Sequence, residues 1–514
     1  IFSGIVVRHG LSITGSNDSR LTIECRDKAV KMTVGRKNAQ YLNKSDADVI
    51  TQLIQAHALT AKVASTTPVH DELIQYYCSD WDYMLARAEA SGCLVVVSDG
   101  TVDVAAPQVS RAAVLSVEYG SDLIEFEADL DASHQYGKVQ ASAWSIQAQA
   151  LVHSASHAPA VLNAQGNLDS ASLAKVLGLD TLALQTGAPL AKDALDGWAK
   201  AQQLKSGLSR LRGRMRFQGS ALAEVGKLVE VKGVGERFSG AVFVTGATHQ
   251  LEDGNWTTEI EFGLPVVSDT ERSDLMAPAA SGLVPGIEGL HVGVVRKLDK
   301  DPGGEHRVQV TVPSAGVDSV WARLLQFSAS NAFGAFFAPE IGDEVLLGWF
   351  SNDPGYPVVL GSLYSSKHPP PTPLSAKNEI KTLVTRCKAK LEFNDEDKVI
   401  TLLTPGNNKM VFSDKDKTIV ITDQNGNKVE LGTGGIRLDS PKDIKISAKG
   451  AISIDALGAV SVSSRADVNV DGLNVNCTAQ LGMVAKGSAT AELSASGQTT
   501  VKGCLLYTSP SPRD

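Results

Sequence analysis

Apolar residues return in pairs every eight positions toward the C-terminal end of the chain. The stretch DIKISAKGAISIDALGAVSVSSRADVNVDG, residues 443–472, holds four such pairs, and Gly450, Gly458, Ala466 and Asn474 close the octads. The two residues of a pair are separated by one position, so they share one face of a short strand. The paired residues are Ile444, Ile446, Ile452, Ile454, Val460, Val462, Val468 and Val470. This fixed period predicts a stack of short strands.

One chain cannot enclose a core with octads of this length. Eight extended residues span at most ~28 Å, and packed sheets lie ~10 Å apart, so an octad is too short to turn around a core. Three chains that each contribute a strand and a turn per layer can enclose one, and closure removes exposed strand edges. We therefore predict an intertwined trimeric β-helix with the paired residues in its core. A stacked solenoid of one chain is the alternative.

The phase of the octads changes near the end of the chain. Leu473, Val475 and Cys477 fall one residue out of phase, and the stretch KGSATAELSASGQ that follows is small and polar. We expect the repeat to decay after Asn474, as the stack thins toward its tip. The final stretch CLLYTSPSPRD, residues 504–514, fits neither pattern and resembles translated adapter sequence.

Helical spacing is clearest in two stretches of the first hundred residues. SDADVITQLIQAHAL opens with Ser45 as N-cap and Asp48 in a capping-box position, ahead of an apolar helical face. SDWDYMLARAEASG begins at Ser79 or Asp80 and ends at Gly92. CLVVVSDGTVDV then predicts two strands joined by an Asp-Gly turn. Further strands are expected over 107–165, and helix over the Ala/Leu-rich stretch 168–206.

Strict alternation in SRLRGRMRFQG predicts a half-exposed strand. Its arginines are expected on one face, and Leu211 and Met215 on the other. The arginines are Arg210, Arg212, Arg214 and Arg216. We interpret the arginine face as the solvated outside of a barrel, with a grip on an acidic partner as the alternative.

Turn-rich and proline-rich stretches divide the chain. Aromatic residues make up only 5% and there are 46 glycines, which suits many short strands better than large helical cores. The predicted parts are a base (1–270), a linker (271–288), a small β-domain (289–365), a Pro-rich hinge (366–379), a needle of short strands (380–503) and the unrelated tail (504–514).

Charge and cysteine content limit the function classes. The net charge of −9 argues against a nucleic-acid-coating protein. The six cysteines form no CxxC motif, which favours reduced thiols over a disulfide framework. No apolar run reaches the ~20 residues of a membrane-spanning helix, and no secretory signal is evident at the start.

Residues 291–365 carry an ordered set of motif positions. Arg307, Val308 and Val310 share one strand, PEIGDEV covers 339–345, and GSLY covers 361–364. This set resembles the small barrel of VgrG proteins, the spike tips of type VI secretion systems, which are similar to phage tail hubs and needles. The residues taken as the barrel motif are Trp321, Pro339, Gly342, Asp343, Asp353, Pro354 and Gly361.

Two stretches of the base resemble the hub domain of the same family. QYYCSDWDYMLARAEASG is similar to its Asp-Trp-Asp helix. GKLVEVKGVGERFSGAVFVTGATH, followed by NWTTEIEFG, resembles the close of the hub. The matching positions there are Gly235, Phe238, Gly240, His249, Trp256 and Glu259.

The resemblance implies a mainly β protein with some helix. It implies a hub of two barrel-like subdomains with inserted helices, a small OB-like β-barrel, and a C-terminal intertwined trimeric β-helix. The implied function is mechanical: a homotrimeric spike that a contractile machine drives through a target envelope. An equivalent spike of a phage tail or extracellular contractile particle is the alternative.

The resemblance also implies partners and a route. The partners are a ring of tube protein at the base, a tip-capping protein at the needle end, effectors with their adaptors, and the baseplate. Contact with the target membrane is transient, and no nucleic acid, cofactor or metal is expected. Such a protein is made in the bacterial cytoplasm and exported without a signal peptide, to the extracellular space or a target cell.

Few residues suggest catalysis. Glu340, Asp343 and Glu344 are clustered carboxylates, but a strand-entry turn offers them no distinct environments, so we assign them to a turn. HSASH, with His153 and His157, lacks the glutamate of a zinc protease motif. A spike with its own hydrolase domain is the enzymatic alternative, and the gaps after Tyr364 and Gly503 are expected to be too short for one.

Overall fold

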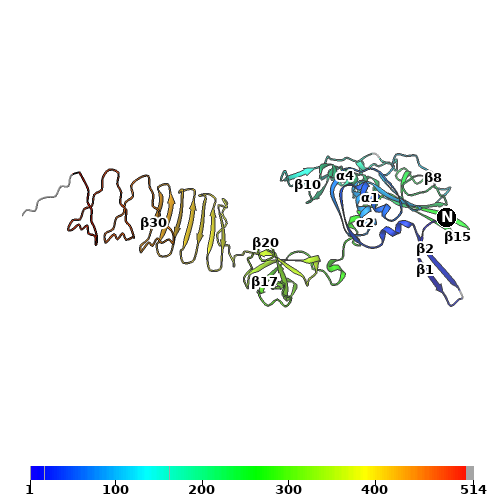
Figure 1. Cartoon of the computed structure of the whole chain (residues 1–514). Coiled ribbons are helices and arrows are strands. Elements are labelled where there is room, and N and C mark those ends of the chain that lie inside the picture. The colour runs from blue at the N-terminus through cyan, green and yellow to red at the C-terminus, as the bar shows by residue number, and fades with distance from the viewer. Residues whose placement is uncertain (1, 17, 161, 505–514) are drawn as a thin grey trace, which may run out of the picture. The chain divides into compact units, whose positions relative to one another are not determined.

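The computed structural model describes residues 2–16, 18–160 and 162–504. The chain divides into two compact units, 1–365 and 366–514 (Figure 1). Most of the described secondary structure is strand, and helices occur only in the first unit. The expected class, mainly β with some helix, is confirmed.

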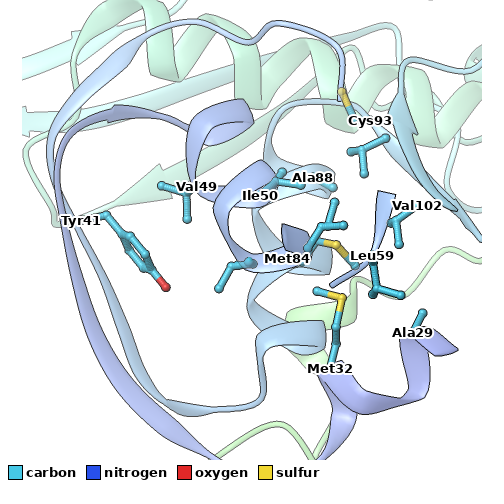
Figure 2. Close-up of a cluster of buried hydrophobic side chains, with 13 residues drawn as sticks. Ala29, Met32, Tyr41, Val49, Ile50, Leu59, Met84, Ala88, Cys93 and Val102 are labelled. Atoms are coloured by element: carbon cyan, nitrogen blue, oxygen red, sulfur yellow. The ribbon is translucent and has the colours of Figure 1, made fainter. Parts of the chain in front are cut away.

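The first part of the base packs two helices against short sheets. Both helices begin as the sequence predicts: Ser45 caps α1 in a full capping box with Asp48, and Ser79 caps α2. Met32, Ile50 and Met84 lie at the centre of the core between them (Figure 2). The elements are β1 (Ile5–Ile13), β2 (Ser19–Arg26), η1 (Lys28–Thr33), β3 (Lys37–Ser45), α1 (Asp46–Ala56), β4 (Thr60–Val63), β5 (Val69–Cys78), α2 (Asp80–Ala90), β6 (Leu94–Ser98) and β7 (Thr101–Ala105).

A six-stranded sheet forms the second part of the base. Its order is β8-β14-β15-β16-β13-β9, and Met215 and Phe217 lie in the core beneath it. Where sub-barrels were expected, the sheets of the base are open among the described residues. The strands are β8 (Leu115–Glu118), β9 (Leu123–Leu130), β13 (Leu211–Gln218), β14 (Leu228–Lys232), β15 (Gly240–Glu252) and β16 (Asn255–Phe262).

The stretch 168–206 is not helical throughout. It holds a strand, β12 (Thr181–Thr186), between α3 (Ser170–Leu177) and α4 (Lys192–Leu208). Strand β12 pairs in parallel with β10 (Lys138–Ser145), whose other neighbour is β11 (Ala150–His153). The long-range pairing outweighs the helix propensity of this Ala/Leu-rich segment.

Residues between the base and the barrel contact both parts. The Arg36 guanidinium donates to the carbonyls of Asp274 (2.8 Å) and Met276 (3.0 Å). The backbone N–H of Ile287 donates to Asn352 O of the barrel (2.8 Å). The predicted linker is therefore held by polar contacts at each end. The short helix η2 (Asp269–Glu271) ends where the linker begins, and η3 (Ala279–Gly282) lies within it.

Five strands of the small β-domain close into a barrel in the order β17-β18-β19-β23-β22. This five-stranded closed arrangement is that of an OB-like barrel, and Val310, Ala322, Val345 and Leu347 fill its core. The strands are β17 (His291–Lys297), β18 (Val308–Val312), β19 (Val317–Leu324), β22 (Glu344–Trp349) and β23 (Pro357–Ser362). The other elements are η4 (Pro313–Ala315), β20 (Ser328–Ala329), β21 (Gly334–Ala335) and η5 (Phe350–Asn352).

The second unit begins with a seven-stranded antiparallel meander. Each strand has five residues and pairs with the next along the chain (Figure 1). The strands are β24 (Ile380–Val384), β25 (Lys390–Asn394), β26 (Val399–Leu403), β27 (Lys409–Ser413), β28 (Thr418–Thr422), β29 (Lys428–Gly432) and β30 (Gly435–Asp439). From residue 440 to 504 the backbone is extended between regular bends, with no assigned strand among these described residues.

Candidate interaction surfaces

One face of the meander is apolar and uncovered. Phe412 is 36% exposed and Leu438 57%, although both lie in the middle of strands. Lys381 is the one charged residue on this face, at the first strand. The apolar members are Leu383, Leu391, Phe393, Ile400, Leu402, Met410, Phe412, Ile419, Ile421, Val429, Leu431, Ile436 and Leu438. We call this set the meander face.

The opposite face of the same sheet is mixed and carries ion pairs along single strands. Lys390 pairs with Glu392 (2.9 Å), and Lys428 with Glu430 (2.6 Å). Such residues suit contact with water. The two faces therefore differ in chemistry, and the meander face is the one that requires a partner.

A repeat of nineteen residues, missed in the sequence analysis, builds the meander. KLEFNDEDK at 390–398 returns as KMVFSDKDK at 409–417. At equivalent turns, Thr385 Oγ1 accepts from Ala389 N (3.1 Å), Thr404 Oγ1 from Asn408 N (3.2 Å), and Asp423 Oδ1 from Asn427 N (2.8 Å). One capping side chain per repeat thus fixes each five-residue turn.

The turns at the other edge of the meander are charged. Asp397 N donates to Asn394 Oδ1 (3.0 Å), and Asp416 N donates to Ser413 Oγ (3.0 Å), again nineteen residues apart. Lys415 links the two turns through Asp397 (2.8 Å). These contacts hold successive hairpins in line.

The predicted needle-core residues all lie in the extended segments that follow the meander. The first member of each pair is between 54% and 59% exposed, and the second between 72% and 79%. A single chain therefore leaves these β-branched side chains in water. The members are Ile444, Ile446, Ile452, Ile454, Val460, Val462, Val468 and Val470.

In the barrel, the clustered carboxylates shape a turn. Asp343 Oδ2 accepts from the Glu340 N–H (2.8 Å), and Asp343 N donates to Glu340 O (3.1 Å). Gly342 has φ +94°, a value that disfavours side chains. Pro339 is buried before the turn, and Glu344 begins β22. This geometry gives Asp343 a structural hydrogen bond within the turn.

The remaining motif residues lie on one sheet or at its turns. Trp321 pairs with Gln309 across β18 and β19, and Gly361 pairs with Leu346 across β22 and β23. Asp353 Oδ1 accepts from Gly355 N (2.9 Å), which shapes the turn after exposed Pro354. The motif is thus distributed around the barrel rather than gathered at one pocket.

A second turn, between β17 and β18, is also held by an aspartate. The Asp301 carboxylate accepts from the backbone N–H groups of Gly303, Glu305 and Arg307 and from the Arg307 guanidinium (2.6 Å). The hydrogen bonds from Arg307 hold the pKa of Asp301 well below its usual range.

Comparison with known families decides what this barrel is. Residues 291–364 match the type VI secretion system/phage-baseplate injector OB domain. The match spans all five strands of the closed barrel. The resemblance drawn from its motif residues is confirmed.

A curated relative agrees with the injector OB-domain assignment. The type VI secretion system spike protein VgrG4b of Pseudomonas aeruginosa is 38% identical over 58 residues. The match covers 11% of this chain and 7% of that protein, so the two are compared over a short stretch. By their descriptions, both matches are components of injection machines, and the chain is similar to such spike proteins.

The base and the overall fold have further matches. Residues 1–253 match the Alg8 N-terminal domain. A prophage tail protein of Shewanella oneidensis is 10% identical, with coverage of 51% of this chain and 78% of that one, at a TM-score of 0.38. An Escherichia coli type VI secretion component is 14% identical, with coverage of 70% and 83%, at a TM-score of 0.31. Both TM-scores lie below 0.5, so the assignment depends on the injector OB domain.

The injector OB domain also presents exposed aromatic residues. The hairpin β20–β21 lies outside the closed barrel, and Phe327 beside it is 99% exposed. The Gln326 side chain accepts a hydrogen bond from Phe337 N (3.0 Å), which joins the two ends of this hairpin segment. No basic residue lies within 326–337, so this patch lacks the cationic partner that nucleic-acid stacking sites use.

The arginine row of β13 is neutralised within the base. Arg214 lies between Glu127 of β9 and Glu261 of β16 in register, and Arg216 between Glu125 and Glu259. The Arg214 guanidinium donates to Glu127 (2.9 Å). Cross-strand ion pairs of this kind stabilise a sheet modestly. The row therefore presents alternating charges and no free cationic face.

Arg210 is not part of that face, contrary to the sequence-based prediction. It precedes β13 and is only 5% exposed. Its guanidinium donates to the carbonyls of Asn163 (3.0 Å), Gln165 (3.2 Å) and Gly207 (3.2 Å). Burial lowers the pKa of Arg210 from its ordinary value. The residue clamps a loop from inside the base.

The Asp-Trp-Asp helix anchors the base through its first aspartate. Buried Asp80 accepts from Lys37 Nζ (2.7 Å) and Gln75 Nε2 (3.0 Å), and its carboxylate contacts His57 Nε2 (2.8 Å). Burial alone would raise the pKa of Asp80, but the hydrogen bonds from these partners outweigh it and lower the pKa. Asp82 faces the cap, where it accepts from Ser79 Oγ (2.6 Å).

The hub-like residues that close the base lie in the six-stranded sheet or, for Gly235 and Phe238, in the connection between β14 and β15. The rings of His249 and Trp256 lie 6.0 Å apart, and the His249 ring contacts Thr258 Oγ1 (2.9 Å). Gly235 and Gly240 have positive φ, and Glu259 lies opposite Arg216 in register. Phe238 contacts the ring of Phe126.

Other candidate chemistry finds no support in the described chain. His153 ends β11 and His157 forms a bridge with Val139, so the two histidines do not share a helix. No cluster of three potential metal ligands occurs among the described residues. In the same residues no helix is both long and apolar enough to span a bilayer.

Proposed function

We propose that the chain is a structural spike of a contractile injection system, of the type VI secretion kind, and that it acts as a homotrimer. The injector OB domain at 291–364 is the observation that carries this proposal. The uncovered meander face supports the trimer, because an isolated sheet with one apolar face requires a partner layer. The exposed needle-core pairs favour the same assembly.

The proposed work of the trimer is mechanical. The base sits on a ring of tube protein within the baseplate, and a small protein caps the far end of the needle. Effectors travel on the spike or its cap, and the trimer leaves the bacterial cytoplasm with them, crossing the target membrane transiently. The chain has no catalytic role of its own in this proposal, and Asp343, the central one of its three clustered carboxylates, serves as a hydrogen-bond acceptor within a turn.

The oligomeric state of the purified full chain tests this proposal. Light scattering and native mass spectrometry are expected to give three times the mass of one chain, unchanged on dilution through the micromolar range. A monodisperse monomer would contradict the spike assignment. Neighbouring genes separate the alternatives: membrane-complex components indicate type VI secretion, and tail-fibre genes indicate a phage tail.

A further inference from the structure

The octad region contains eight extended segments of equal length. Each has six residues, and the backbone bends between them (Figure 1). Two residues form each bend, except that Leu473 alone separates the fourth segment from the fifth. Asn474 therefore starts a segment, and the expected decay after it is not found in the backbone. The segments are 443–448, 451–456, 459–464, 467–472, 474–479, 482–487, 490–495 and 498–503.

Numbering residues within each segment restores a single sequence pattern. The second and fourth positions hold the four known pairs and then Val475/Cys477, Met483/Ala485, Ala491/Leu493 and Thr499/Val501. The sixth position is small in every segment: Ala448, Ala456, Ser464, Gly472, Ala479, Gly487, Ala495 and Gly503. After the one-residue slip the second and fourth positions include smaller residues and the polar Thr499, but each segment still has at least one apolar residue on the same face.

Exposure follows this numbering at two positions beyond the slip. Val475 is 55% exposed, close to Ile444 at 54%, and Leu493 is 76% exposed, close to Ile446 at 72%. Met483 (68%) lies between the two classes, and Val501, at a fourth position, is 59% exposed. Residues that a strict period of eight would place on opposite faces therefore have equal environments. The bend at Leu473 is shorter by one residue, and the second and fourth positions of the following segments stay on the same face of the chain.

We infer that the second, fourth and sixth positions form one continuous stripe, from Ile444 to Val501, which two further copies of the chain cover. This inference rests on the proposed homotrimer and extends its core through the region expected to decay. Between residues 443 and 503, all described, no backbone hydrogen bond or strand pairing occurs. Buried strands require such partners.

Only another copy of this chain fits the whole stripe. The distance from the start of one segment to the start of the next is eight residues, except between the fourth and fifth segments, where it is seven. A covering chain must have the same spacing. A partner with a regular period would lose register at Leu473, since a shift of one residue reverses the faces of a strand. A copy of the chain carries the same short step at the same place.

The stripe predicts that Cys477 faces the shared interior while Asn476 faces outward. We would test this in the full chain with the exposed Cys25, Cys387 and Cys504 changed to serine. One variant keeps Cys477, and the other carries Cys477→Ser with Asn476→Cys. Diamide oxidises two neighbouring thiols to a disulfide and takes up their two electrons and two protons.

Non-reducing gels then report which position links chains. The variant with Cys477 is expected to form disulfide-linked dimers, limited to two chains of each trimer, and the variant with Asn476→Cys is expected to remain unlinked. Linkage through position 476 alone, or through neither position in a confirmed trimer, would overturn the stripe and leave the proposed spike standing. A monomer by light scattering would overturn both.

A second pair of variants tests the stripe without cysteine chemistry. Leu493→Asp places three carboxylates in the interior, whereas Ser494→Asp places them on the outside. We expect protease to cleave within 482–503 in the first variant and to spare this region in the second. Equal resistance of the two variants would contradict an inward Leu493.

Discussion

Two charged side chains hold backbone turns in place. Asp301 gathers three backbone N–H groups between β17 and β18, and Arg210 donates to three backbone carbonyls in the base. Asp301 does so in a largely exposed loop, whereas Arg210 is buried and supplies donors to carbonyls inside the base. At the scale of single residues, the charges with the most hydrogen bonds therefore serve the fold of a mechanical protein.

Replacing Asp301 is expected to loosen the barrel. Asp301→Asn removes the ion pair with Arg307, so hydrogen exchange of residues 299–312 in the full chain should become faster. Asp299→Asn, an exposed change in the same loop, is the matched control and should leave exchange unchanged. Equal exchange in both variants would show that the clamp is dispensable.

The same clamp should depend on pH in one direction. The pKa of Asp301 is lower in the folded chain than in the unfolded chain, so its stabilisation is complete above the ordinary carboxyl range. It is lost as the pH falls toward the folded pKa. Exchange of residues 299–312, corrected for intrinsic rates, should therefore accelerate in acid more in the wild type than in Asp301→Asn.

Replacing Arg210 should loosen a loop of the base. Arg210→Met keeps the bulk of the side chain but removes the guanidinium donor from the Gln165 carbonyl and one of the two donors from the Asn163 carbonyl. Leaving a buried carbonyl without its donor costs about 1–3 kcal/mol. Hydrogen exchange of residues 163–169 is the measurement. Arg214→Gln removes an arginine from the exposed row and should leave that loop unchanged, and a comparable loss there would refute the clamp.

At the scale of elements, the second unit combines strands that pair within the chain with extended segments that do not. The meander returns in nineteen residues and pairs its strands within the chain, while the extended segments return in eight and leave their backbone unpaired. In both, side chains alternate along each strand so that one face is richer in apolar residues than the other. The assembly of several chains is thus favoured throughout residues 380–503.

A charge on the meander face should prevent this assembly. Leu402→Asp places a carboxylate between Leu391 and Met410, where each copy would bury it without a partner. We expect failed trimer formation by light scattering. Thr401→Asp adds the same charge on the opposite face of the same strand and should assemble normally. A trimer from both variants would mean that the meander face remains in water.

Local signals made some elements predictable and others not. The caps of α1 and α2 are written in adjacent residues, and the injector OB domain is evident from its motif. Strand β12 depends on pairing with β10, which is distant in the sequence. Arg210 fits the alternating arginine pattern of β13, but it precedes the first residue of that strand, so the pattern alone placed it on the wrong face. The short step at Leu473 broke a fixed period and was mistaken for decay, because the position of a bend is not visible in composition.

At the scale of the whole molecule, the division into two units separates a part with several buried apolar cores from a part with an uncovered apolar face. The first unit closes its barrel and buries several apolar cores. The second leaves an apolar face exposed along its length. A mechanical role fits this arrangement, because strength then comes from interchain packing.

The purified protein is expected to lack cell-wall hydrolysis. Incubation with peptidoglycan should release no more product than a heat-inactivated control, since the Asp343 carboxylate is engaged in a turn hydrogen bond and Glu344 begins strand β22. Product above that control, lost in the triple variant Glu340→Gln, Asp343→Asn and Glu344→Gln, would establish an enzymatic activity and contradict the proposed role.

The bend at Leu473 is one residue shorter than the other bends, so the stack of segments is not strictly periodic. In a strictly periodic stack, a chain displaced by one segment meets the same spacing in its neighbours, so several alignments bury equal areas. Here, if one chain is displaced by one segment, its seven-residue step lies beside an eight-residue step of its neighbours. The segment between the short step of one chain and that of the next is then shifted by one residue and turns its polar side inward. The short bend therefore fixes the alignment of the chains, because only the arrangement without displacement buries the apolar positions of all segments.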